Sequence, residues 1–308
     1  MSGPTARDGG ISGSLEPIDL SVLVVSWNTR DLLRQCLRSA LKNLGGMSAE
    51  IIVVDNASAD GSAEMVRREF APEPRVRLIA NPGNEGFARG NNQAYEAARG
   101  EFLAVVNPDV TFTGPVLRDM AEYLQGRPIV GIVSCNLVGT DGSSQSLHRR
   151  FPSLGIVLCH WTRLGRRIDR WLLGGWVARR YHLVDIRREG EVSVDQAAAA
   201  CLMLGRSTVE RIGGLFDERF PIFFNDVDLS RRVWKAGLEV HVLYNLSVTH
   251  HGGASIKQMH PGTKNLQQID GLRRYYDLHE PRWKGRVVSL LISAKRRRAA
   301  RAAARSRA

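Results

Sequence analysis

Two acidic residues far apart in the sequence are of the type that metal-assisted chemistry needs. Asp109 comes directly after an apolar, strand-like run and the stiff step Asn107-Pro108. Asp226 lies more than a hundred residues later, and the pair His250-His251 follows it. Mg²⁺ and Mn²⁺ prefer carboxylate oxygen and take phosphate oxygens as further ligands, and an imidazole suits transition-metal ions. Because a second carboxylate can take a proton from an alcohol, this set indicates sugar-nucleotide chemistry, in which a cation holds a diphosphate and a base activates a hydroxyl group.

Each of these residues also has a purely structural interpretation. The sequence Asn-Pro-Asp is good turn chemistry, and a single histidine is more often structural than metal-binding. Asp226 and Asp228 would lie in the first turn of a helix, where the helix dipole favours acids, and Arg231 and Arg232 offer Asp228 partners. The aromatic and apolar run 220–224 favours a functional role for Asp226, since a partly dry wall raises the pKa of a carboxylate and makes it a better base.

A loop rich in Gly and Asn, residues 81–92, leads into a predicted helix that starts near Phe87. Backbone N–H groups at a helix start attract phosphate or other polar ligand atoms. The loop is neither a GxGxxG motif nor a P-loop with its lysine, so neither of those nucleotide-binding folds is indicated.

The elements that must position these residues can be predicted from apolar runs that alternate with helical segments. We expect strands at 19–25, 51–54, 76–80, 102–106 and 130–134, and helices at about 30–44, 61–70, 87–99 and 115–126. This alternation is typical of an α/β fold with a mostly parallel central sheet and helices on both faces. Ligands of such sheets bind beyond the carboxyl ends of the strands, which is where Asp55 and Asp109 lie.

Beyond residue 140 the pattern is less regular. We expect helices at about 207–212 and 227–236, extended segments at 240–243 and near 248, and a helical extension at 256–308. The last thirteen or so residues are rich in Ala and Arg and show no apolar face. Residues 1–18 are expected to form a disordered leader and not a signal peptide, which leaves 19–255 as the main domain. The four separated cysteines are typical of reduced thiols in a cytoplasmic protein.

The net charge of +12 is concentrated in two basic segments. Residues 149–188 contain ten Arg and two Asp, and residues 282–308 contain ten Lys or Arg and no acid, so the remainder is acidic. The Trp- and Arg-rich segment 149–190 and the basic tail are typical of peripheral contact with an anionic membrane surface. The alternatives are a solvated helical face for the segment and a solubilising tail. Nucleic acid is disfavoured as a partner because the chain has no motif that reads DNA or RNA.

Seven blocks of this sequence, in their order and spacing, resemble the family 2 glycosyltransferases with the GT-A fold. They are most similar to the bacterial rhamnosyltransferase-like branch, which extends polyprenyl-diphosphate-linked sugars. The resemblance covers roughly residues 20–255. The blocks are 24–28, 52–62, 81–92, 107–109, 213–218, 226–229 and 250–253.

The resemblance implies a role for each candidate site residue. Asp226 would be the general base. Asp109, the remaining acid of the family's DxD-type element, would bind Mg²⁺ or Mn²⁺, and His250 or His251 would complete that metal site. The residues implied to bind the nucleotide sugar, with Asp55 reading the base, are Ser26, Trp27, Asn28, Asp55, Asn84, Gly86, Asn91 and Asn107.

Two departures from the family pattern lie next to these residues. Asn107 stands at the first position of the DxD-type element, and Asn225 replaces the Glu that commonly precedes the base. The carboxylates that the mechanism needs are nevertheless both present.

The implied activity is that of an inverting, metal-dependent glycosyltransferase. It would move a sugar, with L-rhamnose from dTDP-rhamnose favoured among dTDP- and UDP-sugars, onto a lipid-diphosphate or glycan acceptor at the inner face of the plasma membrane. The alternatives are a catalytically inactive nucleotide-sugar-binding protein, motivated by Asn107 and Asn225, and a nucleic-acid-binding protein, motivated only by the charge.

Overall fold

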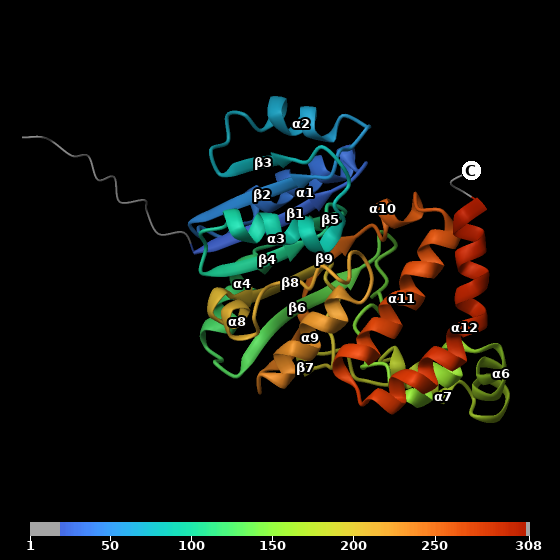
Figure 1. Ribbon diagram of the computed structural model, residues 1–308. Helices are drawn as coiled ribbons and strands as arrows, with labels where there is room; N and C mark the ends of the chain where they lie inside the picture. Colours follow the sequence, from blue (N-terminus) through green and yellow to red (C-terminus); the bar gives the residue numbers. More distant parts are fainter. Residues whose placement is uncertain (1–18, 306–308) are drawn as a thin grey trace, which may run out of the picture.

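The computed structural model describes residues 19–305, and the strands of this part of the chain form one nine-stranded sheet (Figure 1). The strand order is β3-β2-β1-β4-β8-β6-β9-β5, and β7 also pairs with β9. The strands are β1 (Leu20–Ser26), β2 (Ala49–Asp55), β3 (Val76–Ala80), β4 (Phe102–Val106), β5 (Val110–Phe112), β6 (Val130–Val138), β7 (Glu191–Ser193), β8 (Cys201–Gly205) and β9 (Glu239–His250).

The sheet contains two parallel groups. β3, β2, β1 and β4 are parallel neighbours, and β6 and β9 form a second parallel pair. β8 runs antiparallel to both β4 and β6, while β5 and β7 pair antiparallel with β9. The predicted α/β fold is confirmed, but the three antiparallel strands have no signal in the alternation pattern. The two extended segments expected at 240–243 and 248 are parts of the single strand β9, whose register against β6 shifts between them.

Helices cover both faces of the sheet because successive residues of each buried strand point to opposite sides. On β1, Val22 and Val24 belong to one core, and Leu23 and Val25 belong to the other. The first core is covered by α1 (Arg30–Lys42), α2 (Ser62–Glu69) and α4 (Val116–Gln125). The second is covered by α3 (Phe87–Ala97), α8 (Arg206–Arg211) and α9 (Asn225–Lys235). The predicted helices therefore form near their expected positions.

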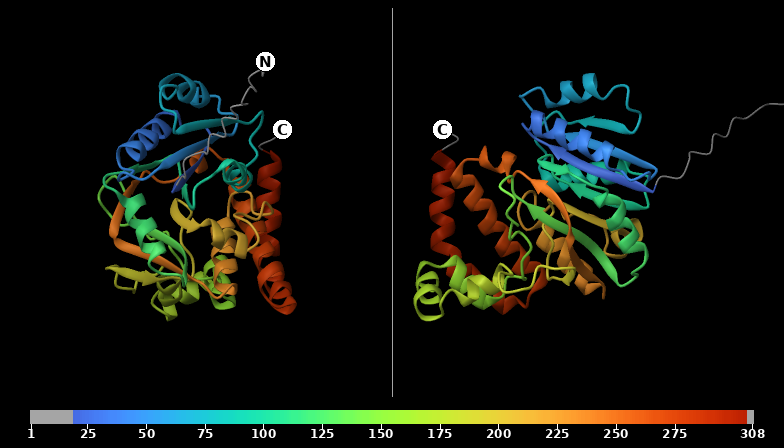
Figure 2. Two further views of the ribbon diagram at one scale, coloured as in Figure 1. Left: turned by 90° about the vertical axis from the view of Figure 1, so that its left-hand side faces the viewer. Right: turned by 180° about the vertical axis from the view of Figure 1, so that it is seen from behind.

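A third core joins the sheet to a group of helices that stands beside it (Figures 1 and 2). Phe224 and Val227, at the start of α9, pack there with Tyr275, Tyr276 and Ile292. The helices of this group are α5 (Leu154–Ile156), a π-helix (Val157–Trp161), α6 (Arg163–Leu172), α7 (Trp176–Tyr181), α10 (Ala254–Lys257), α11 (Pro261–His279) and α12 (Arg282–Arg305). The helical C-terminal extension is thus present and packs next to the turn that carries Asp226.

The basic C-terminal segment differs from its sequence-based description. Helix α12 buries Val288, Ile292, Ala299 and Ala303, which lie along one side of it. The expectation that the last residues have no apolar face is therefore wrong, because alanines supply one against Gly262, where α11 and α12 come very close. The expected leader, residues 1–18, lies outside the described residues.

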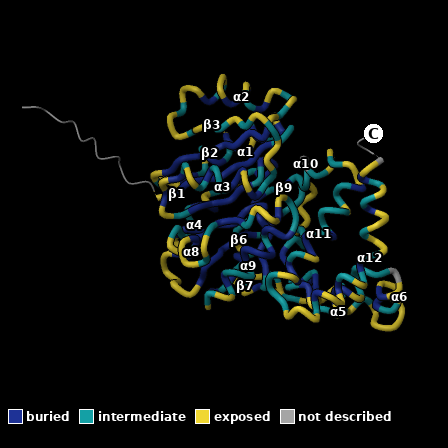
Figure 3. Tube along the Cα trace, in the orientation of Figure 1, coloured by how far each residue is buried: buried dark blue, intermediate teal, exposed yellow. Residues whose placement is uncertain are grey.

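Exposed residues lie on α2, α6 and one side of α12, and also on turns at the edge of the sheet such as 125–129 (Figure 3). Within residues 19–305, no helix combines the length and the apolar character that crossing a bilayer requires.

Candidate active site

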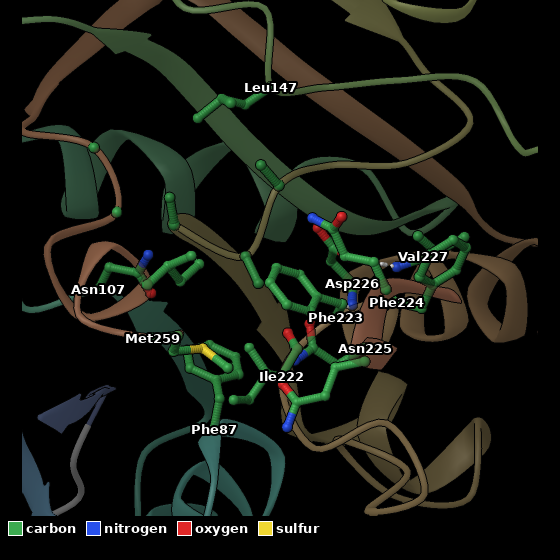
Figure 4. A pocket seen from close by; sticks show the side chains of 18 of the residues that line it. Phe87, Asn107, Leu147, Ile222, Phe223, Phe224, Asn225, Asp226, Val227 and Met259 are labelled. Carbon is green, nitrogen blue, oxygen red and sulfur yellow. Dashed lines mark hydrogen bonds between the residues drawn. The ribbon is translucent and has the colours of Figure 1, made fainter. Parts of the chain in front are cut away.

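A cavity of about 1230 Å³ lies where the carboxyl ends of β1 and β4 meet the turn before α9 and the end of β9. In Figure 4, Asn107 lies on one side of this cavity and Phe223, Asn225 and Asp226 lie on the other. The predicted site residues that line it are Trp27, Asn84, Asn107, Asp109, Asp226 and His250. The two carboxylates that the sequence singles out therefore share one cavity.

Asp109 lies beside His250 because β5 pairs antiparallel with the end of β9. The register sets Val110 opposite His250, and the backbone N–H of His251 donates to the carbonyl oxygen of Asp109 at 3.0 Å. Asp109 Oδ1 is 3.4 Å from His250 Nε2, and both side chains are buried. The side chain of His251 does not line the cavity, so His250 is the histidine that the fold places next to Asp109.

Gln145 fixes the orientation of the His250 ring. Its Nε2 donates to the backbone oxygen of His250 at 2.8 Å, which identifies its other terminal atom as the oxygen, 2.7 Å from His250 Nδ1. An amide oxygen only accepts, so Nδ1 carries a proton, and in the neutral ring the lone pair is on Nε2, the atom nearest Asp109. A carboxylate oxygen and an imidazole lone pair in this arrangement suit a divalent cation, and no signal in the sequence marks Gln145 for this task.

Asp226 is held at the first turn of α9 by a strained turn. Phe224 precedes the helix at φ 68°, a left-handed conformation that costs free energy for a bulky residue. The Asn225 side chain donates to the Ile222 oxygen at 2.8 Å and accepts from the Asp226 N–H at 2.7 Å. Asn225 therefore stabilises the turn, a task for which an amide, which both donates and accepts, is suited and a carboxylate is not.

The environment of Asp226 makes it a stronger base than an exposed carboxylate. Burial raises its pKa, and the charge of Arg149 and hydrogen bonds from backbone N–H groups, including that of Val227, oppose this rise. The dry wall expected from residues 220–224 is present, since Ile222, Phe223 and Phe224 line the same cavity.

Asp228 has a structural role, because its buried carboxylate is paired with neighbouring side chains. It is 1% exposed, and its carboxylate contacts Arg232 Nε at 2.8 Å and His279 Nε2 at 2.7 Å. These contacts join α9 to α11, so Asp228 holds the helix on which Asp226 stands. Arg231, the other expected partner, instead pairs with Glu280.

The residues expected to bind the nucleotide lie at the carboxyl ends of β1 and β2. Asp55 is buried, its Oδ1 accepts from the Ser58 N–H at 3.0 Å, and its Oδ2 has no hydrogen-bond partner in the described part of the chain. Ser26 Oγ is 3.0 Å from Thr29 Oγ1, and Asn28 Oδ1 accepts from the Ala59 N–H at 2.7 Å. Ser26, Asn28 and Asp55 therefore form the base of this region, while only Trp27 of the turn lines the cavity itself.

The loop before α3 is tied to the turn before α9. Asn84 Oδ1 accepts from the Gly86 N–H at 3.0 Å, and the Phe87 N–H donates to the Pro221 oxygen at 2.8 Å. A side chain at Gly86, whose φ is 86°, would press on that same oxygen. Asn91 is fully buried behind the loop and donates to the Phe87 oxygen, so it supports the loop and does not line the cavity.

The other end of the cavity carries side chains that were expected only as part of a basic segment or a tail. Arg149 and Arg166 line it from the segment 149–190, and Lys295 reaches it from α12. His160 and His182 lie with them. Their meeting depends on the packing of α12 against the π-helix and α6, which spacing along the chain does not show.

Comparison with known proteins agrees with this geometry. A sequence profile described as "Glycosyl transferase family 2" matches residues 21–194. An N-acetylglucosaminyl-diphospho-decaprenol L-rhamnosyltransferase of Mycobacterium tuberculosis is 27% identical over 248 residues, which cover 75% of this chain and 76% of that protein. The O-antigen biosynthesis protein RfbC of Myxococcus xanthus is 28% identical over 236 residues, 77% of this chain. The chain spans 17% of the length of RfbC, and 27% of an uncharacterized Sinorhizobium fredii protein that is also 27% identical.

Solved structures share the fold. A mannosyltransferase of Pyrobaculum calidifontis, in complex with GDP-Man and Mn²⁺, superposes with a TM-score of 0.57 at 17% identity, over 94% of this chain and 75% of that one. GalNAc-T7 with UDP, GalNAc and Mn²⁺ gives a TM-score of 0.56 at 15% identity, over 76% of this chain and 43% of that one. The fold is therefore GT-A-like, and the profile match over more than half of the chain shows that this chain belongs to glycosyl transferase family 2.

Proposed function

We propose that this glycosyltransferase moves a sugar from a nucleotide donor to a lipid-linked or polysaccharide acceptor, with inversion at the anomeric carbon. The observation that carries the proposal is that Asp109 and Asp226 line one cavity at the carboxyl edge of the sheet. The similarity to an N-acetylglucosaminyl-diphospho-decaprenol L-rhamnosyltransferase supports L-rhamnose as the transferred sugar and a lipid diphosphate as the acceptor. The nucleotide that we propose for this donor is dTDP.

The residues beside β5 fit a divalent cation. Asp109 supplies a carboxylate and His250 an oriented lone pair, whereas no group of three or more His, Cys, Asp or Glu within the described residues could hold an ion. The donor diphosphate and water would therefore provide the remaining ligands of Mg²⁺ or Mn²⁺. The ion, when bound, would neutralise charge on the departing nucleoside diphosphate.

The opposite end of this edge fits a nucleoside base. Asp55 Oδ2 is buried and accepts no hydrogen bond from residues 19–305, and such an atom is stabilised when a ligand supplies a donor. The N–H group of a thymine or uracil ring is a donor of the required kind. Ser26, Trp27 and Asn28 would shape the pocket around that ring, and Asn84, Gly86, Asn91 and Asn107 would form or support the wall along the sugar and diphosphate.

Asp226 would be the general base. Its carboxylate takes the proton of the acceptor hydroxyl while that oxygen bonds to the anomeric carbon and the bond from this carbon to the diphosphate oxygen breaks. The raised pKa of Asp226 favours proton transfer, and the apolar side chains of Ile222 and Phe223 limit the access of water.

A surface on α6, α7 and α12 supports a peripheral position at the inner face of the plasma membrane. Leu164, Trp171, Leu172 and Trp176 are exposed, and Leu290 of α12 is 77% exposed. Arginines at 167, 170, 179 and 180 stand among them. Apolar side chains among arginines suit the headgroup region of an anionic bilayer, and the partner would be lipid and not nucleic acid. Helices α6 and α7 belong to the segment 149–190, and α12 carries the basic tail, so the proposed contact involves both basic segments.

A ligand-binding screen tests the proposal. Melting temperatures would be measured with dTDP-rhamnose, UDP-sugars and GDP-sugars, each with and without Mn²⁺, since a ligand that binds only the native state raises the melting temperature. We expect a rise that needs Mn²⁺ and is lost in Asp109→Asn, followed by transfer to an N-acetylglucosaminyl-diphospho-lipid. The absence of any rise with every donor would contradict the proposal, and binding without product across acceptors would indicate a catalytically inactive binding protein.

A further inference from the structure

The cavity has an unbalanced charge at the end beyond Asp226. Asp109 and Asp226 are the only acidic residues that line it among the described residues. Arg149, Arg166 and Lys295 line the other end, and none of the three forms an ion pair within the described part of the chain. A nearby acid, Asp169, does not line the cavity, and its two carboxylate oxygens accept from the backbone N–H groups of Val177 and Ala178 and form no ion pair with these cations within the described residues.

Two of the three cations lie against aromatic rings. The Nε atom of Arg149 is buried and has no hydrogen-bond partner among the residues that the structure describes, and its guanidinium lies 5.6 Å from the ring centre of Tyr181. Lys295 Nζ lies 4.7 Å from the ring centre of Trp161. Aromatic rings hold these cations in place but do not cancel their charge.

Neighbouring groups respond to this positive charge. Burial, with the charges of Arg149 and His160, lowers the pKa of His182 to about 4. Burial, with the charges of Arg149, Lys295 and Arg166, also lowers the pKa of His160. A group of cations that disfavours further protonation of its neighbours is stabilised when an anion binds among them.

We infer that Arg149, Arg166 and Lys295 form a second anion subsite, which binds the phosphate or diphosphate group of the acceptor. The inference rests on the proposed function, since it assigns this end of the cavity to the acceptor because the donor occupies the Asp109 end. Arg149 is close enough to Asp226 for its charge to lower the pKa of that carboxyl. A sugar linked to phosphate holds its hydroxyls within one ring of the phosphate, so the subsite would present one of them to Asp226.

Binding of a soluble probe tests the subsite without any transfer reaction. Geranyl diphosphate would be titrated calorimetrically in EDTA, which removes the divalent ion that the donor end needs. The parent residues Arg166 of α6 and Lys295 of α12 line the rim, meaning the end of the cavity beyond Asp226. The two rim variants are Arg166→Gln and Lys295→Gln. The matched control is Arg297→Gln, which removes the same charge from an exposed position of α12 outside the cavity.

We expect each rim variant to bind geranyl diphosphate about tenfold more weakly than Arg297→Gln, as loss of one charge-assisted hydrogen bond predicts. Geraniol should not compete. Equal binding by all three variants, or equal binding of geraniol, would overturn the subsite.

Sedimentation with phosphatidylglycerol vesicles distinguishes a site for the acceptor phosphate from a site for a lipid headgroup phosphate. Sedimentation of Arg166→Gln and Lys295→Gln at the level of Arg297→Gln supports an acceptor site. Weaker vesicle binding together with unchanged geranyl diphosphate binding would overturn it in favour of a headgroup site. Because no sugar donor is present, failure of the proposed function leaves this result unaffected, and the two ideas can fail separately.

Discussion

Asp226 and Asp228 stand in the same first turn of α9, two residues apart, in opposite environments. Asp226 faces the cavity, where burial raises its pKa. Asp228 points to the other side, where Arg232 and His279 pair with it. Asp226 is therefore suited to proton transfer, whereas Asp228 holds the helix in place. A substitution of one residue leaves the contacts of the other intact.

Loss of the Asp228 carboxylate should destabilise the fold. Asp228→Ala leaves Arg232 and His279 without their acid and loosens α9 from α11. Breaking one partner of a buried ion pair typically costs about 3–5 kcal/mol. Urea unfolding would measure this as a lower midpoint. The matched variant Asp226→Asn should unfold within about 1 kcal/mol of the parent, and an Asp228→Ala protein as stable as the parent would refute the assigned role.

Removal of the Gln145 amide should weaken metal binding without removing a ligand. In Gln145→Leu the His250 ring loses the acceptor that fixes its proton on Nδ1. Changes of this kind commonly cost about 10- to 100-fold in metal affinity. Mn²⁺ titration followed by electron paramagnetic resonance, in the presence of UDP, would measure the loss. His251→Ala serves as the control and should bind Mn²⁺ like the parent; the reverse order of the two variants would assign the metal to His251.

The rate of sugar transfer should decrease at low pH, at a pH set by the pKa of Asp226. The base must be ionised, so kcat/KM decreases as the pH drops through the pKa of Asp226, which burial holds above the ordinary aspartate value of 3.8. Arg149 favours the ionised form, so Arg149→Gln should raise that pKa further and move the acid limb to higher pH. Arg297→Gln should leave the limb in place. An acid limb at the same pH in Arg149→Gln as in the parent would contradict the electrostatic coupling between Arg149 and Asp226.

Membrane contact should depend on the exposed apolar side chains of α6. Trp171 and Leu172 are 79% and 77% exposed. If both enter the headgroup region, Trp171→Ser with Leu172→Ser should weaken binding to anionic vesicles by about tenfold or more, since each buried apolar side chain contributes about 1.5–3 kcal/mol. Ile129→Ser, at an exposed site on the sheet side of the molecule, is the control. Unchanged sedimentation of the double variant would exclude α6 as the contact.

The pattern of apolar residues in the sequence predicted much of the sheet and the part of the site at the carboxyl ends of its strands. Buried parallel strands are continuous apolar runs, so the ends of β2 and β4, and with them Asp55 and Asp109, could be located from the sequence. The ordered motifs then located Asp226 and His250. The contacts that set their chemistry are long-range: Gln145 meets His250 across more than a hundred residues, and Lys295 reaches the cavity from α12.

Two features could not be predicted from local patterns, because both depend on contacts between segments far apart in the chain. The antiparallel strand β8 inserts between β4 and β6, a pairing that depends on tertiary topology and not on the pattern of any one segment. The apolar stripe of α12 includes Ala299 and Ala303, which hydropathy alone does not distinguish from the alanines around them. The close approach of α12 to Gly262 of α11 is at Ala302 and Ala303, where only small residues fit.

Sugar transfer by Asp226→Asn, measured beside its affinity for UDP and Mn²⁺, tests the central claim most directly. We predict that transfer falls at least about 100-fold, because the amide cannot accept the hydroxyl proton, while the affinity for the nucleotide and the ion stays at the parent value. Transfer at the parent rate by a variant that binds UDP and Mn²⁺ normally would contradict the claim that this carboxylate is the base.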